Sequence, residues 1–286
     1  MKIGLVPANI GAPSGEMMLG LAQLAEQVGF ESIWTFEHAI VPIDYASKYP
    51  YAESGKMGID PDTNLVDPFI ALTAIAARTQ TIRLGTGVNI LPQANPLYVA
   101  KQAASLDFVS NGRLELGLGI GWLREEFQAA GTPFERRGAR FDDYMVALRK
   151  VWSGDMVEHD SDFIQWSGFK SYPLPVQEGG IPVIMGGSKG KIYERIAKYG
   201  DGWYIPVNTA ADAVPLIEPL AAACEAVDRD PASVELTSMW TAQGGLEEVQ
   251  AFADAGVERL IVPLFALGQD PVAGIGKLAE DIISKV

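Results

Sequence analysis

Cysteine and histidine are almost missing from this chain of 286 residues. The single cysteine, Cys224, excludes an intrachain disulfide, and its place in an alanine-rich helical stretch favours a small buried hydrophobe over a reactive thiol. The two histidines, His38 and His159, lie far apart in the sequence, and no His or Cys cluster has metal-ligand spacing, so we expect no metal site. The Gly-x-Ser-x-Gly motif of a serine hydrolase is also absent.

Long hydrophobic runs and positive charge are scarce as well. No apolar run approaches the roughly 18 residues of a membrane span, and the opening stretch MKIGLVPAN has no signal-peptide pattern. Lys and Arg number 22 against 36 Asp and Glu, which gives a net charge of -14. This balance argues against a nucleic-acid partner and against an anionic membrane surface. We therefore expect a cytoplasmic protein that acts on a small molecule.

What the sequence does contain is a regular alternation of strand-like and helix-like segments. Eight apolar strand-like segments are each followed by a segment with apolar residues at helical spacing. Strands that are apolar on both faces are typical of a parallel sheet covered by helices. The expected strands are 2–9, 31–38, 81–90, 113–121, 181–187, 201–206, 234–241 and 257–265.

Eight such units predict an α/β fold, a closed (β/α)8 TIM barrel, with residues 1–286 as a single domain. An open doubly wound sheet is the alternative. Two long insertions stand out, 39–66 after strand two and 154–180 before strand five. The first insertion is expected to form a lid, an oligomer contact or surface packing, and its tyrosines are Tyr45, Tyr49 and Tyr51.

In a (β/α)8 barrel the active site forms at the carboxyl ends of the strands. Glu37 and His38 end strand two, which makes His38 a catalytic candidate, whereas His159 lies in the polar run EHDSD and is expected in a solvated loop. Glycines at the ends of strands three and four favour close backbone approach to a flat ligand, with barrel-corner bending as the alternative. The residues at these two strand ends are Gly87, Val88, Asn89, Gly119, Gly121 and Trp122.

The stretch MGGSKGKIYERIAKYG (185–200) is similar to a phosphate-binding loop. Gly186 and Gly187 leave room for an anion, Ser188 is placed to cap the next helix, and the N–H groups at a helix start favour negative charge. A simple tight turn is the alternative interpretation. The positively charged residues of this stretch are Lys189, Lys191, Arg195 and Lys198, and we expect the first three to contribute to the anion site.

Several of these stretches together resemble the bacterial luciferase-like monooxygenase superfamily, specifically its branch of oxidoreductases that use the deazaflavin coenzyme F420. The resemblance rests on LGTGVNILP, on NPLYVAKQAASLDFVSNGRLELGLGIGW and on LREEFQAAGTPFERRG. Further matches are EH after strand two, IPVIMGG with its helix, and DGWY. Together they cover most of residues 1–206.

The resemblance implies a (β/α)8 barrel with a bound flavin or deazaflavin, whose ring rests on a non-proline cis peptide bond at Gly87–Val88. It also implies that His38, with Glu37 beside it, binds substrate or positions a proton at the reactive edge of the ring. The cofactor-binding residues that it implies are Gly87, Val88, Asn89, Gly119, Gly121, Trp122, Met185, Gly186, Gly187 and Ser188.

We therefore expect an oxidoreductase that moves a hydride between coenzyme F420 and a small organic substrate. The alternatives are an FMN-dependent monooxygenase that uses oxygen, a non-catalytic flavin-binding barrel, and a phosphate-binding biosynthetic barrel without flavin. Trp122 stands where sugar-phosphate dehydrogenases of the resembled branch carry an acidic residue, which argues against a sugar-phosphate substrate. The resemblance also implies that the protein forms a homodimer.

Overall fold

The computed structural model describes residues 1–286 and contains a closed barrel of eight parallel strands. The strands pair in the order β3-β2-β1-β11-β10-β9-β8-β5, and β3 also pairs with β5, which closes the ring. This confirms the predicted (β/α)8 barrel and excludes the open sheet. The barrel strands are β1 (Lys2–Val6), β2 (Ser32–Thr35), β3 (Arg83–Thr86), β5 (Leu114–Gly119), β8 (Val183–Gly186), β9 (Gly202–Ile205), β10 (Glu235–Met239) and β11 (Arg259–Pro263).

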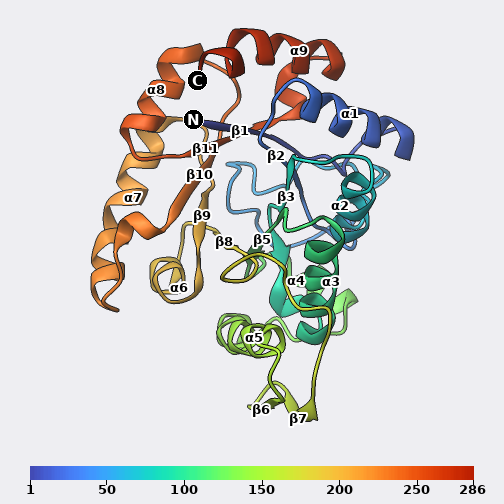
Figure 1. Cartoon of the computed structure of the whole chain (residues 1–286), viewed down its shortest axis with the longest axis vertical. Helices are drawn as coiled ribbons and strands as arrows, with labels where there is room; N and C mark the ends of the chain where they lie inside the picture. Colours follow the sequence, from blue (N-terminus) through green and yellow to red (C-terminus); the bar gives the residue numbers. More distant parts are fainter.

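Helices surround these strands (Figure 1), and none of them combines the length and the apolar character needed to cross a membrane. Two helices begin as their sequences predict: Asp67 and Asn95 cap α2 and α3 through their side chains, and a proline follows each. The α-helices are α1 (Gly15–Gln27), α2 (Pro68–Ala76), α3 (Pro96–Val109), α4 (Arg124–Ala129), α5 (Arg137–Trp152), α6 (Ile192–Tyr199), α7 (Ala210–Glu225), α8 (Gly245–Asp254) and α9 (Pro271–Asp281). Short 3-10 helices cover Leu91–Gln93, Pro231–Ser233, Leu264–Leu267 and Ile283–Lys285.

The third predicted strand is interrupted. Instead of one strand over 81–90, β3 ends at Thr86, and the chain resumes pairing with β5 as the two-residue strand β4 (Asn89–Ile90). The two residues between them are therefore free of the regular ladder. Of the two insertions, 39–66 has no strand or helix beyond one isolated bridge at Leu65, whereas 154–180 carries an antiparallel hairpin.

This hairpin corrects the prediction for His159. The hairpin consists of β6 (Val157–Asp160) and β7 (Gln165–Phe169) and lies beyond α5 in Figure 1. His159 is not in a solvated loop: it is 8% exposed, and its Nε2 lies 2.9 Å from Asp143 Oδ1. Part of the polar run EHDSD belongs to β6, in which buried and exposed residues alternate. The polar composition of the run therefore led to a wrong prediction of a solvated loop.

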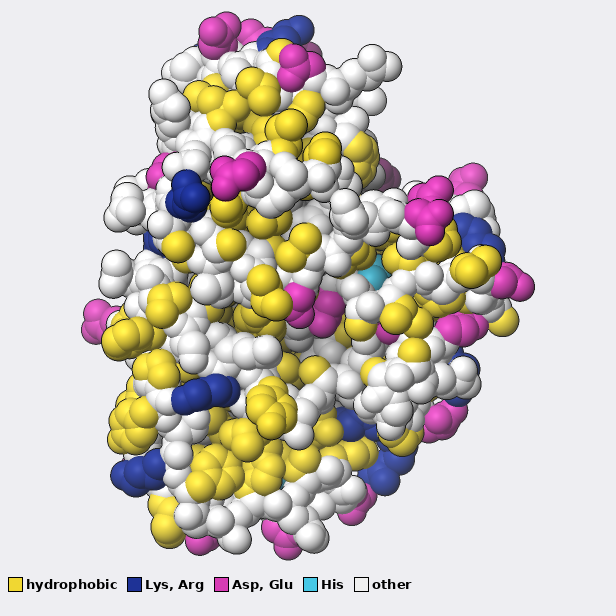
Figure 2. Space-filling model, turned by 90° about the vertical axis from the view of Figure 1, so that its right-hand side faces the viewer, with side chains coloured by type: hydrophobic (Ala, Val, Ile, Leu, Met, Phe, Trp, Pro, Cys, Tyr) yellow, Lys and Arg dark blue, Asp and Glu magenta, His cyan; other side chains and the backbone are white.

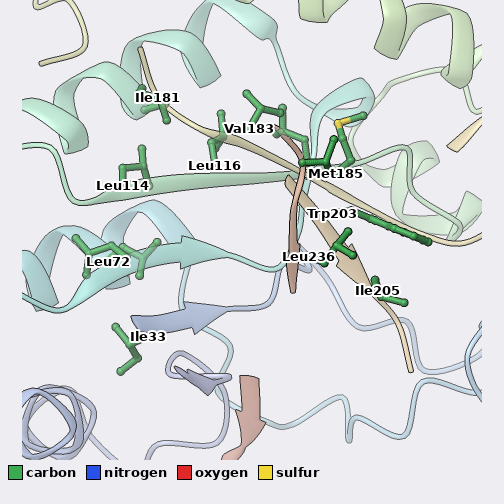
Figure 3. Close-up of a cluster of buried hydrophobic side chains, with 14 of the residues drawn as sticks. Ile33, Leu72, Leu114, Leu116, Ile181, Val183, Met185, Trp203, Ile205 and Leu236 are labelled. Carbon is green, nitrogen blue, oxygen red and sulfur yellow. The ribbon is translucent and has the colours of Figure 1, made fainter. Parts of the chain in front are cut away.

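Side chains that point outward from the strands pack against the helices and form the main hydrophobic core, part of which is drawn in Figure 3. Met185 belongs to this layer: it is 1% exposed, and its Cγ lies 2.6 Å from where a Cβ on Gly200 would stand. The side chain of Met185 is therefore part of the core, which leaves only its backbone for the cofactor contact that the resemblance implied. Cys224 is buried in α7, as expected for a structural cysteine.

The amino-terminal end of the barrel is filled by charge instead. Arg259, 1% exposed and first in β11, binds three glutamates, at 2.8 Å from both Glu31 and Glu115 and also in contact with Glu235. Arg83 adds a second cation at Glu115. These residues lie at or near the starts of their strands, so the network occupies the end of the barrel opposite the expected active site.

We expect Arg259→Met to lower the free energy of unfolding by about 3–5 kcal/mol. The reason is that Glu31 loses its ion-pair partner and the buried Glu115 keeps only Arg83. Urea denaturation measures the change. The matched control is Arg78→Met, since the ion pair of Arg78 with Glu16 is long and exposed at 3.9 Å, and its loss is expected to cost less than about 1 kcal/mol. Equal losses in the two variants would contradict the assignment of the network as a structural element.

Candidate active site

The loops that follow the strands meet at one end of the barrel, which is called the mouth below. His38 follows β2, Trp122 follows β5 and Gly187 follows β8. The rings of His38 and Trp122 lie edge to face with centroids 6.2 Å apart, so residues distant in sequence do come together here. Figure 2 shows one face of the molecule, on which acidic side chains and a histidine lie at the wall of a central hollow.

The link between β3 and β4 lies at this mouth. The Gly87–Val88 peptide bond is cis and involves no proline, which confirms the position that the resemblance implied. A Cβ atom on Gly87 would lie 2.8 Å from the ring of Tyr204, a residue of β9. Position 87 therefore has room only for glycine, because the aromatic ring of Tyr204 already occupies the space.

The side chain of Val88 packs directly onto the backbone of neighbouring strands. A Cβ atom on Gly119 or on Gly186 would lie 2.7 Å from a methyl group of Val88, and one on Gly117 would lie 3.3 Å from it. Gly117 also faces the Thr86 carbonyl oxygen, at 1.7 Å from such a Cβ. The glycines of β5 and β8 thus make room for Val88, so the structure gives Gly119 and Gly186 a packing role where a cofactor contact was expected.

Gly121 also has a packing role. Its φ is +78°, and a Cβ there would lie 2.7 Å from both Ile90 and Phe127. A side chain at this position would therefore be strained by its backbone conformation and by its neighbours alike.

Two buried polar atoms beside the Gly87–Val88 link have no hydrogen-bond partner. They are Oδ1 of Asn89, a residue that is 3% exposed, and the hydroxyl of Tyr204, which is 6% exposed. Burial raises the pKa of the Tyr204 hydroxyl well above its usual range, so this group is a neutral donor. Unpaired buried polar atoms are rare in folded proteins and commonly mark the place of a water or a ligand.

Glu37 makes no hydrogen bond to His38, although it precedes it in the sequence. Its carboxyl group accepts a hydrogen bond from Asn89 Nδ2 at 3.0 Å and another from the Ile90 N–H. Burial raises the pKa of Glu37 to about 8, despite the hydrogen bond from Ile90, which lowers it. The charge of Glu126 raises the pKa further. These contacts fix β4 beside β2, and they indicate a structural task for Glu37.

His38 instead contacts Glu126, a residue of α4 that no sequence motif had singled out. His38 Nδ1 lies 3.0 Å from Glu126 Oε2, and Glu126 is 2% exposed. The other oxygen of this carboxylate accepts the N–H groups of Ala39 and Ile40. The only sequence signal was a pair of acidic residues directly after the fourth predicted strand, within the stretch LREEF.

The first insertion is held to α4 by the neighbouring glutamate. Glu125 Oε1 accepts the N–H groups of Ala46 and Ser47 at 2.8 and 3.2 Å, and Ser47 Oγ accepts the N–H of Arg124. Burial raises the pKa of Glu125, but these hydrogen bonds outweigh it and lower the pKa to about 2. The irregular segment 39–66 is therefore fixed at its start by two carboxylates.

Beyond these contacts the insertion adds an aromatic wall. Tyr45 and Tyr49 contact the ring of Trp122, with centroids 5.8 and 5.2 Å away, and Tyr51 contacts Tyr49. The Tyr51 hydroxyl lies 3.7 Å from the position of a Cβ on Gly187, so the insertion reaches from β2 past β5 to β8. The three tyrosines thus line the mouth.

The loop after β8 has the open space expected of an anion site but lacks some of the expected groups. Gly187 has a φ of +122°, a conformation that favours glycine, and nothing lies closer than Tyr51 to its missing Cβ. Ser188 does not cap α6, because Lys191 is the N-cap and no side chain caps this helix. Arg195 is buried in an ion pair with Asp142, so its predicted contribution to the anion site is wrong.

No group of three or more His, Cys, Asp or Glu side chains is arranged to hold a metal ion. The polar groups at the mouth are one imidazole, buried carboxyl groups, tyrosine hydroxyls and backbone amides.

Gly119→Ala is expected to lower the free energy of unfolding by about 1–3 kcal/mol, because the new methyl group overlaps Val88. In a Val88→Ala background the same change is expected to cost almost nothing, since the next contact, with Ile90 Cδ1 at 3.7 Å, is an ordinary van der Waals contact. A double-mutant cycle by urea denaturation measures this coupling. Gly276→Ala is the control, because nothing lies within 4 Å of that helical position. An equal penalty in both backgrounds would refute the contact.

The raised pKa of Glu37 predicts a pH-dependent stability. Between the ordinary carboxyl pKa of 4.5 and about 8, the folded protein holds a proton that the unfolded chain has lost. The contribution of Glu37 to the free energy of unfolding therefore falls by roughly 2–4 kcal/mol from about pH 5 to about pH 8. Denaturation curves at both pH values measure it, and Glu37→Gln is expected to lose this part of the slope. Parallel pH profiles for the two proteins would exclude Glu37 as its source.

Comparison with known proteins places these features in a family. A family model described as luciferase-like monooxygenase matches residues 6–263. An uncharacterised protein of Mycobacterium tuberculosis is 31% identical over 233 residues, which are 80% of this chain and 76% of that protein. A 5,10-methylenetetrahydromethanopterin reductase of Methanolobus tindarius is 29% identical and covers 76% of this chain and 58% of its own. The oxygenase component of a flavin-dependent trigonelline monooxygenase of Acinetobacter baylyi is 30% identical, over 58% of this chain and 41% of its own.

Solved structures share the fold. An F420-dependent secondary alcohol dehydrogenase in complex with an F420-acetone adduct has a TM-score of 0.79 and 16% identity, over 99% of this chain and 98% of its own. The coenzyme F420-dependent tetrahydromethanopterin reductase of Methanopyrus kandleri has a TM-score of 0.77 and 15% identity at the same coverage. At these identities the structures bear on the fold alone. The family-model match, which spans the barrel from β1 to β11, shows that this chain belongs to the luciferase-like monooxygenase family.

Proposed function

We propose that the protein is an oxidoreductase that binds coenzyme F420 at the barrel mouth and transfers a hydride between it and a small organic substrate. Family membership supports an oxidoreductase, and the two structural neighbours described above are F420-dependent enzymes by name. The observation that carries the proposal is the pair of buried, unpaired polar atoms, Asn89 Oδ1 and Tyr204 Oη, beside the Gly87–Val88 link.

The residues around this link fit a planar ring with polar edges. Val88 turns its side chain into the barrel, onto the glycines of β5 and β8, and so leaves its backbone as a flat support. Asn89 Oδ1 is an acceptor and Tyr204 Oη is both a donor and an acceptor. A flavin or deazaflavin ring has carbonyl and N–H groups along one edge, and these match the two unpaired atoms.

The loop of residues 187–191 is the part of the mouth that fits a phosphate. Gly187 offers open space and Ser188 offers a hydroxyl group. No side chain caps α6, and the N–H groups at a helix start favour negative charge. Lys189 and Lys191 are exposed and add positive charge within an acidic protein. Together they would hold the phosphate end of the cofactor.

The cofactor, when bound, supplies the hydride chemistry. The chain supplies orientation, shielding and a proton-handling group. The aromatic wall of Trp122, Tyr45 and Tyr49 would exclude water from the substrate. The His38 Nε2 atom makes no hydrogen bond in the structure, and it is not among the fully buried atoms, so it is open to a substrate oxygen. His38 is therefore the residue to which we assign substrate binding and proton transfer.

An FMN-dependent monooxygenase is the second candidate, because the trigonelline monooxygenase component is a flavin-dependent relative at 30% identity. The same ring support and the same phosphate loop suit FMN, so the residues at the mouth fit either cofactor. Only direct binding separates the two.

The decisive experiment is a titration of apo-protein with F420 and with FMN, read by quenching of the fluorescence of each cofactor. We expect saturable binding of F420 at micromolar or lower concentration and at least about tenfold weaker binding of FMN. Tight binding of FMN with no binding of F420 would overturn the first candidate in favour of the second.

A His38→Ala variant separates an enzyme from a non-catalytic flavin-binding barrel. Turnover of the loaded enzyme is expected to fall by about 100-fold or more, as for loss of a general acid or base, while the affinity for the cofactor changes little. Phe108→Ala is the matched control, because Phe108 is an exposed aromatic residue in the last turn of α3. Unchanged turnover of the His38 variant would remove His38 from the proposed chemistry.

A further inference from the structure

The proton arrangement on His38 is set by its neighbour on α4. Glu126 is buried, with 2% exposure, and its carboxylate accepts three hydrogen bonds, from His38 Nδ1 and from the N–H groups of Ala39 and Ile40. Backbone N–H groups are donors only, so two of the three contacts require Glu126 to be the acceptor. Both N–H groups bind Oε1, and an ionised Glu126 can only accept at Oε2 as well, so the third contact requires a proton on His38 Nδ1.

We infer that Glu126 is a positioning residue that holds His38 in the Nδ1–H tautomer and directs an unprotonated Nε2 toward the substrate. The inference deepens the proposed function and rests on it for the catalytic task of His38. The opposite tautomer would place the lone pair of Nδ1 against a carboxylate oxygen only 3.0 Å away, which is repulsive. Nε2 therefore remains the atom that can accept a proton from a substrate hydroxyl group, or return one when protonated.

Two further sets of contacts hold His38 in place, one at its imidazole ring and one at the backbone that follows it. The Trp122 ring lies at 83° to the imidazole with centroids 6.2 Å apart, which opposes rotation of the imidazole. The hydrogen bonds from Ala39 and Ile40 tie the backbone directly after His38 to the same carboxylate. Glu126 thus fixes both the side chain and the main chain of this short segment.

Glu125 provides a matched comparison within the same turn of α4. Its carboxylate also accepts backbone N–H groups of the insertion, from Ala46 and Ser47, but it makes no contact with His38. A change from carboxylate to amide at either position therefore removes one negative charge from α4, and only the change at position 126 alters the partner of the imidazole.

The test is the tautomer of His38, read from the nitrogen chemical shifts of ¹⁵N-histidine-labelled protein in long-range ¹H–¹⁵N correlation spectra at about pH 8.5, where free imidazole is neutral. The chain has two histidines, so the spectrum is simple. His159 is an internal reference, because its Nε2 contacts Asp143 and so predicts the opposite, Nε2–H, tautomer. We expect wild-type His38 to show a proton on Nδ1.

In Glu126→Gln, the amide oxygen still accepts from Ala39 and Ile40, and the amide nitrogen then donates to Nδ1. His38 is therefore expected to change to the Nε2–H tautomer in this variant and to remain Nδ1–H in Glu125→Gln. Turnover of the loaded Glu126→Gln enzyme is expected to fall by about tenfold or more at unchanged affinity for the cofactor.

The inference is wrong if wild-type His38 carries its proton on Nε2, a result that needs no variant to fold. It is also wrong if Glu126→Gln keeps the Nδ1–H form, or changes the tautomer without loss of turnover. Failure of both cofactors to bind would overturn the proposed function, and it would leave the tautomer measurement intact as a separate result.

Discussion

The packing of one side chain onto bare backbone is the constraint on which the mouth of this barrel depends. Val88 lies against Gly119 and Gly186 so closely that neither position has room for a Cβ atom. Gly117 has no such room either, because the Thr86 carbonyl oxygen lies against it. The chain can leave the regular ladder between β3 and β4 only because the facing positions on β5 and β8 have no side chains.

The two ends of the barrel differ in how their buried polar groups are paired. At the amino-terminal end, Arg259 and its glutamates fill the interior with paired charge, and each ion there has a partner. At the mouth, Asn89 and Tyr204 keep buried polar atoms without partners. Stability favours satisfied polar groups, and we propose that a bound cofactor supplies the partners of these two atoms.

Much of the fold could be predicted from sequence, because the spacing of apolar residues and the residues that begin and end helices are local properties. The eight strand–helix units and the caps at Asp67 and Asn95 followed from short stretches, and the Gly87–Val88 bond followed from a family motif. Glu126 could not be found in this way, because it meets His38 across 88 residues of sequence. Arg195 was misjudged for the same reason, since its partner Asp142 lies on another helix.

In the insertion of residues 39–66, hydrogen bonds to side chains of α4 hold the backbone in place where regular secondary structure is absent. The insertion has a few hydrogen bonds of its own, such as Tyr49 N–H to the Gly55 carbonyl oxygen, and carboxylates of α4 accept its first N–H groups. His38 lies at the root of this segment, and its imidazole shares Glu126 with the backbone of Ala39 and Ile40. The carboxylate that binds the first N–H groups of the insertion is therefore the one that contacts the imidazole, so the position of this segment and the orientation of His38 depend on the same side chain.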